Sequence, residues 1–130
     1  MLTVTFEKEG KKLTLKVEGH AGQAEIGHDI VCAATSILTY TVAQIVKYEA
    51  DKGGFKDSPI ISLKEGDSIV SCEPSDEKYA EILHSYYVAR VGYMLLAHNF
   101  PQYVELKTFG TESESVNINQ KDSLTHEQKE

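Results

Sequence analysis

One histidine and one cysteine, twelve residues apart, have the side chains that nucleophilic catalysis needs. His20 follows Gly19 in a glycine-containing segment, and Cys32 lies in what the sequence predicts to be the first turn of a long apolar helix. A thiol near a helix N-terminus, with a histidine close by, loses its proton more easily than an ordinary thiol. The pair could therefore supply a thiolate nucleophile and a base that takes and returns a proton.

Two polar residues near Cys32 could support such a pair. Asp29 is a good helix N-cap, since its carboxylate can accept from the backbone N–H groups that follow; Cys32 would then be the third helical residue, inside the positive end of the helix dipole. Asp29 could also orient His20 as the third member of a triad. Ser36, one turn after Cys32, could bond the site or a backbone carbonyl. Unpaired amides at the helix start could hold an oxyanion.

The segment before the cysteine is expected to form a loop over the substrate. Its glycines leave the backbone with few restraints, so we expect a mobile loop that becomes ordered when a substrate binds. The candidate loop residues are Gly19, Ala21, Gly22, Gly27 and His28.

Other interpretations of the same side chains stay open. A lone cysteine on an apolar helix is commonly a small core residue, and we expect that role for Cys72. Zinc accepts the ligand types of His20, His28, Asp29 and Cys32. Their spacing matches no common zinc pattern and the chain has no Cys-x-x-Cys, so we expect no metal.

The flanking segments predict paired strands and two main helices. Apolar and polar residues alternate in the strands, and the first hairpin delivers the chain to His20. This pattern indicates an α+β fold of two layers, an antiparallel β-sheet with the helices packed against it. The predicted elements are a hairpin over 2–18, a helix over 30–50 ending before Gly53, a hairpin over 60–72, a helix from the N-cap Ser75 to about His98, and a strand over 103–109.

The first helix has an unusually broad apolar surface, which predicts burial on more than one side, against the sheet and against a partner subunit. Its expected central stripe is Ile30, Ala34, Ile37, Leu38, Thr41, Ile45 and Tyr48, widened by Val31, Val42 and Val46.

The composition indicates one domain over 1–109 and a polar tail over 110–130 that we expect to be disordered. The net charge of −7 argues against direct nucleic acid binding and suits a basic partner. No secretory signal and no stretch apolar enough to span a membrane is expected. We therefore expect a cytoplasmic protein whose two cysteines stay reduced.

The motif around the pair resembles the ribosomal-processing cysteine proteases called Prp. The matching residues are Gly19-His20-Ala21, then Gly27-His28-Asp29-Ile30-Val31-Cys32-Ala33-Ala34 and Ser36. The resemblance covers 1–109 in the order of elements, but reaches motif level only at this loop and helix start. It implies that His20 and Cys32 are the catalytic pair; His28, which lies closer to Cys32, is the rival base but lacks the Gly-His-Ala context.

The same resemblance implies a homodimeric endopeptidase that needs no cofactor. Bacterial members cut an N-terminal extension from a large-subunit ribosomal protein, after apolar and aromatic residues. Phage-encoded relatives are associated with capsid or scaffold proteins. The alternative from another class is a non-catalytic binding module, ribosome-associated or for phage assembly, whose Cys and His are structural. A thiol-reactive peptide probe would separate the two.

Overall fold

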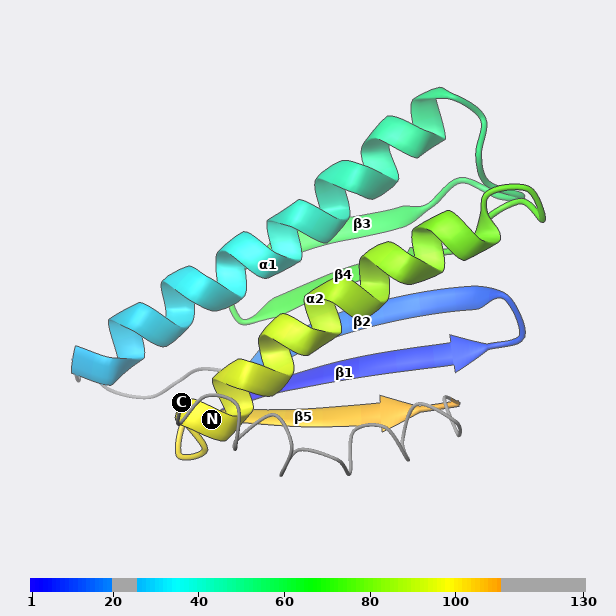
Figure 1. The fold of residues 1–130 in the computed structure, drawn as a ribbon. Coiled ribbons are helices and arrows are strands. Elements are labelled where there is room, and N and C mark those ends of the chain that lie inside the picture. The colour runs from blue at the N-terminus through cyan, green and yellow to red at the C-terminus, as the bar shows by residue number, and fades with distance from the viewer. Residues whose placement is uncertain (20–25, 111–130) are drawn as a thin grey trace, which may run out of the picture.

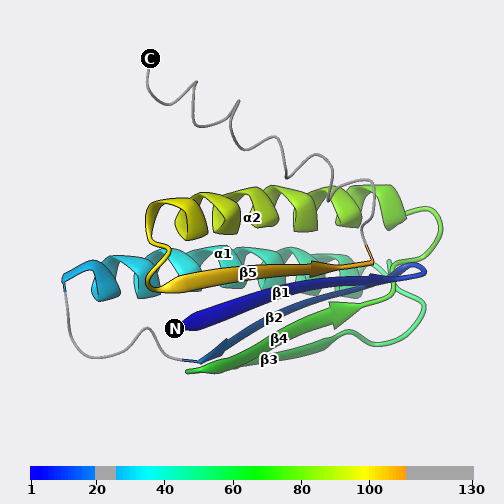
Figure 2. The same cartoon turned by 90° about the horizontal axis from the view of Figure 1, so that it is seen from below.

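The chain folds into a five-stranded sheet with two long helices on one of its faces (Figures 1 and 2). The computed structural model describes residues 1–19 and 26–110, with the backbone alone over 26–29. The elements are β1 (Leu2–Glu9), β2 (Lys12–Gly19), α1 (Ile26–Asp51), β3 (Ile60–Lys64), β4 (Asp67–Cys72), α2 (Tyr79–Asn99) and β5 (Val104–Phe109). The predicted two-layer α+β fold is confirmed. Nearly all of the expected tail lies outside the described residues.

The sheet is mixed, with the strand order β3-β4-β2-β1-β5. Both predicted hairpins are present as antiparallel pairs, but β5 runs parallel to β1, with Leu2 opposite Val104. The expectation of a purely antiparallel sheet is therefore wrong at this one pairing. Its cause is α2, which returns the chain across the sheet so that β5 enters beside β1 in the same direction, and parallel neighbours need such a crossover.

The hydrophobic core lies between the sheet and the helices. Val4, Leu15 and Val70 of the sheet are completely buried, as is Tyr93 of α2. Cys72 is also buried among them, as predicted. Burial of side chains of this size is the main favourable contribution to folding, and it fixes how α1 lies above the sheet.

Helix α1 differs from the prediction in its start and in its buried face. It begins at Ile26, four residues early, and ends as expected at Asp51, before Gly53 with its positive φ of 74°. Val31, Val42 and Val46 form the core face. Three residues of the expected central stripe, Ile30, Ile37 and Tyr48, are 54%, 65% and 61% exposed in the single chain, so the residues expected only to widen the stripe are the ones that pack against the sheet. Apolar residues on two sides of a helix show its period but not which side meets the sheet.

Helix α2 packs beside α1 (Figure 1). It begins at Tyr79, so the expected N-cap role of Ser75 is wrong; the Ser75 carbonyl instead accepts from Lys78 N–H in a turn before the helix. A Cβ on Gly92 would lie 2.8 Å from the Leu38 side chain of α1. The missing side chain of Gly92 therefore lets the two helices approach closely.

The expectation that no segment could span a membrane also needs correction. The helical segment Ile30–Asp51 has a mean hydropathy of 1.5, so it passes a test for helices that are long and apolar enough to cross a membrane. A helix that packs in a protein core passes the same test, so this feature alone does not indicate a membrane span.

Candidate active site

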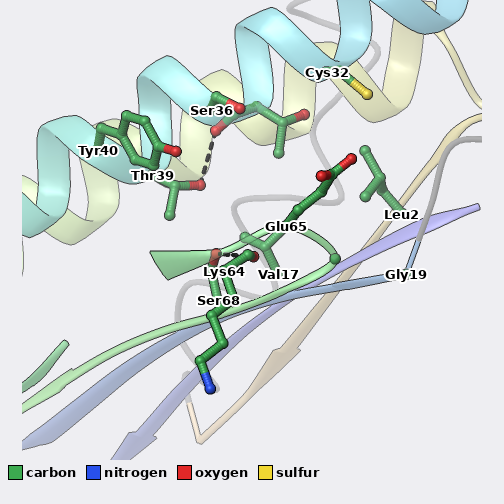
Figure 3. Close-up of a pocket in the computed structure, with 12 residues that line it drawn as sticks. Leu2, Val17, Gly19, Cys32, Ser36, Thr39, Tyr40, Lys64, Glu65 and Ser68 are labelled. Atoms are coloured by element: carbon green, nitrogen blue, oxygen red, sulfur yellow. Dashed lines mark hydrogen bonds between the residues drawn. The ribbon is translucent and has the colours of Figure 1, made fainter. Parts of the chain in front are cut away.

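A cavity of about 360 Å³ opens between α1, the sheet and the β3–β4 turn (Figure 3). Its lining combines apolar side chains from the sheet with hydroxyl groups from the helix, and it contains the thiol of Cys32. The lining residues are Leu2, Val17, Gly19, Cys32, Thr35, Ser36, Thr39, Tyr40, Lys64, Glu65, Gly66 and Ser68.

The helical wall of the cavity carries Cys32. This residue is half-buried, and Ser36 and Tyr40 follow it at intervals of one turn along the same side of α1 (Figure 3). Residues four apart lie on one face of a helix, so the predicted neighbourhood of Cys32 and Ser36 is present. The thiol can meet a molecule that enters the cavity.

The local environment of Cys32 is not the one expected at a helix start. Because α1 begins at Ile26, Asp29 lies inside the helix and cannot be its N-cap. Cys32 is the seventh helical residue. Only the first four amides of a helix lack partners, and the dipole acts mainly in the first turn. The Cys32 amide is therefore paired within the helix, and the expected dipole effect on the thiol is wrong; the unpaired amides lie one turn earlier, at the start of α1.

The other predicted site residues are only partly described. His20, Ala21 and Gly22 lie outside the described residues. Gly27, His28 and Asp29 belong to the first turn of α1 by their backbone, and their side chains are not described. The His20–Cys32 pair therefore stays a prediction.

Gly19, the residue before His20, has a conformation that glycine alone adopts easily. Its φ is +97°, and a Cβ there would lie 2.5 Å from the Met1 carbonyl oxygen. Its N–H donates to the Gly66 carbonyl at 3.0 Å. The chain therefore leaves β2 toward His20 from a point held by both β1 and the β3–β4 turn.

A group of buried hydroxyls lies behind the helical wall. The Thr39 hydroxyl donates to the Thr35 carbonyl at 2.8 Å and bonds the hydroxyl of Tyr93 from α2. The Thr35 hydroxyl is buried and has no hydrogen-bond partner in the described part of the chain. An unpaired buried hydroxyl is costly. Sequence reasoning missed Thr35 and Thr39, although their spacing of three and seven residues from Cys32 indicates the same side of a helix.

Cys72, the second thiol, is chemically unlike a nucleophile. Burial raises its pKa to about 11, partly offset by a hydrogen bond with the Tyr86 hydroxyl. It therefore stays protonated at neutral pH, and the nucleophile must be the thiolate. Cys32, by contrast, lines the cavity described above.

Among residues whose side chains are described, no cluster of three or more His, Cys, Asp or Glu side chains could hold a metal ion. Three members of the candidate zinc set, His20, His28 and Asp29, have side chains outside the described residues. The absence of a metal site therefore stays a prediction.

Comparisons with known proteins give a consistent result. The family model for the cysteine protease Prp matches residues 1–105. The structure of SMU.848 from Streptococcus mutans is similar, with a TM-score of 0.61 and 26% identity over 84% of this chain and 94% of that one.

Two structures of the Staphylococcus aureus ribosomal processing protease Prp share the fold. The complex with a covalently linked product peptide has a TM-score of 0.59 and 22% sequence identity. The complex with a substrate peptide has a TM-score of 0.60 and 21% sequence identity. Both alignments cover 83% of this chain and 99% of the other. Among curated protein sequences, none matches this chain significantly.

Proposed function

This chain belongs to the Prp family of cysteine proteases, and we propose that it removes a short N-terminal extension from a large-subunit ribosomal protein. The observation that carries the proposal is the thiol of Cys32 in a cavity wall that also includes Gly19, the residue before His20. The Staphylococcus aureus structures of the same fold are those of a ribosomal processing protease with product or substrate peptide.

The proposed mechanism uses a His20–Cys32 dyad. His20 takes the thiol proton, and the thiolate attacks the carbonyl carbon of the scissile peptide bond. His20 then gives the proton to the leaving amine, which leaves an acyl thioester on Cys32. Water then attacks the thioester carbon while His20 accepts a water proton; the C–S bond breaks, the carboxylic acid product leaves, and the proton returns to the Cys32 sulfur. No metal or organic cofactor takes part.

Two further residues receive supporting roles. The helix bounds exclude an N-cap role for Asp29, so we assign its carboxylate to the orientation of His20. Ser36 lines the cavity one turn beyond Cys32, and we assign its hydroxyl to hydrogen bonding within the site.

The cavity lining suits an extended peptide with an apolar or aromatic side chain before the cut. Leu2 and Val17 supply apolar surface opposite the hydroxyl-bearing wall of α1. In a phage, a capsid or scaffold protein would take the place of the ribosomal protein. The formal net charge of −7 supports a basic protein, rather than nucleic acid, as the partner.

We place the enzyme in the cytoplasm, away from membranes, as a homodimer. The exposed stripe of Ile30, Ile37 and Tyr48 on α1 supports the dimer. Exposed apolar surface of this kind is typical of an interface when it is continuous.

Replacement of Cys32 tests the proposal. Cys32→Ala should lower cleavage of a peptide that spans the end of the ribosomal extension by about 10³-fold or more, since loss of a nucleophile costs at least this much. Cleavage is measured by mass spectrometry, and folding by thermal melting. Cys72→Ala is the matched control and should still cleave.

Two outcomes would contradict the assignment. Turnover retained by Cys32→Ala would exclude Cys32 as the nucleophile. A wild-type protein that binds the peptide, does not cleave it and leaves an electrophilic peptide probe unreacted would be the binding module instead.

A further inference from the structure

Glu65 lies in the two-residue turn between β3 and β4, opposite the cysteine. Figure 3 shows its side chain extending toward α1, with the carboxylate directed between Ser36 and Cys32. The next residue, Gly66, has a φ of 77° and accepts the hydrogen bond from Gly19 N–H. The turn is therefore tied to the end of β2, which places Glu65 at the rim of the site.

The charge of Glu65 is not balanced within the described part of the chain. None of the ion pairs or hydrogen bonds there involves its carboxylate. Lys64 is the one other charged residue among the described lining residues. Its ammonium group points away from α1 (Figure 3). A negative charge therefore faces the wall that carries the thiol.

We propose that Glu65 makes this site selective for a peptide that carries a lysine or arginine close to the scissile bond. The inference rests on the proposed protease function and adds a specificity residue to it. A cationic side chain in the cavity would pair with the carboxylate, while an acidic one would be repelled. The net charge of the chain, −7, favours approach of the same basic peptides.

The size of the effect follows from the exposure of Glu65. An exposed ion pair contributes little because water competes for both charges. A bound peptide displaces water from the cavity and strengthens the attraction. We expect about a 5-fold preference in kcat/KM for a lysine over a glutamine at the recognised position.

The experiment uses pairs of peptides that differ only by lysine or glutamine, placed in turn at each of about three positions on either side of the cut. The wild type should prefer lysine at one position. Glu65→Gln should bring the lysine-to-glutamine ratio of kcat/KM close to one, and Glu65→Lys should bring it below one. Asp67→Asn is the matched control: it removes the same charge two residues away, outside the cavity lining, and should keep the wild-type ratio.

Each of the following outcomes would overturn the inference. The lysine-to-glutamine ratio of kcat/KM could be the same in Glu65→Gln and in the wild type. Alternatively, Asp67→Asn could lower this ratio as much as Glu65→Gln does, which would indicate that the overall negative charge, and not Glu65 itself, selects the peptide. Equal loss on every peptide, with a shifted pH profile, would make Glu65 a positioning residue for the base. A wild type that cleaves both peptides equally defeats this inference alone, whereas one that cleaves neither defeats the proposed function as well.

Discussion

At the scale of single residues, the surroundings of a thiol decide its chemistry. Cys72 is buried against Tyr86, and burial raises its pKa to about 11. Cys32 borders a cavity but lies in the second turn of α1, beyond the unpaired amides. For Cys32 to act as the proposed nucleophile, its activation must come mainly from a neighbouring base rather than from the helix start. The helix start at Ile26 also places His28 one turn before Cys32, where residues four apart are neighbours.

We expect His20→Ala to lose about 10³-fold or more in kcat/KM, and His28→Ala less than about 10-fold, because His20 is the proposed proton acceptor. Peptide cleavage across a range of pH checks this, with thermal melting to confirm folding. The reverse order of the two effects would assign the base to His28.

At the scale of elements, the sequence predicts which helices and strands exist better than it predicts where each begins and which face it buries. Alternating apolar residues indicated both hairpins, and all predicted strands and helices are present. The predicted start of α1 was wrong because Asp29 has the side chain of an N-cap, yet the helix begins about one turn earlier, at Ile26. The sequence left open which face of α1 meets the sheet, because Ile37 and Val42 are equally apolar and only packing against the sheet separates them.

Gly19→Ala should destabilise the fold by about 2–4 kcal/mol and reduce cleavage, because it adds a strained φ and a clash with the Met1 carbonyl. Gly10→Ala is the control: Gly10 also has a positive φ, of 62°, but nothing lies within 4 Å of its Cβ position. Gly10→Ala should lower the free energy of unfolding by only about 1 kcal/mol. Urea unfolding measures both, and equal losses would show that the contact with Met1 is unimportant.

At the scale of the whole molecule, the site is assembled from segments far apart in the chain. Leu2, Cys32 and Glu65 line one cavity. The local motif identified Cys32 and Ser36, but Glu65 reaches the site through the pairing of β2 with β4. Strand order and register depend on contacts between residues far apart in the chain, and the spacing of a local motif carries no information about them. The opposite wall of the cavity was therefore not predictable.

The exposed stripe on α1 belongs to the same scale, since its proposed partner is a second copy of the chain. Ile37→Glu should weaken the dimer at least about 10-fold, because it places a charge in an apolar interface. Analytical ultracentrifugation measures this. Gln102→Glu, an equal change in charge at an exposed position off the stripe, should have no effect. A monomeric wild type would refute the dimer.

The parallel pairing of β1 with β5 has a practical consequence for the first residues. Leu2 N–H bonds the Tyr103 carbonyl, which holds the beginning of β1 in place, and Leu2 also lines the cavity. An affinity tag joined before Met1 would begin next to Leu2, one of the residues that line the cavity. Such a tag would compete with peptides for the site, so an enzyme made for kinetic work should carry its tag at the other end.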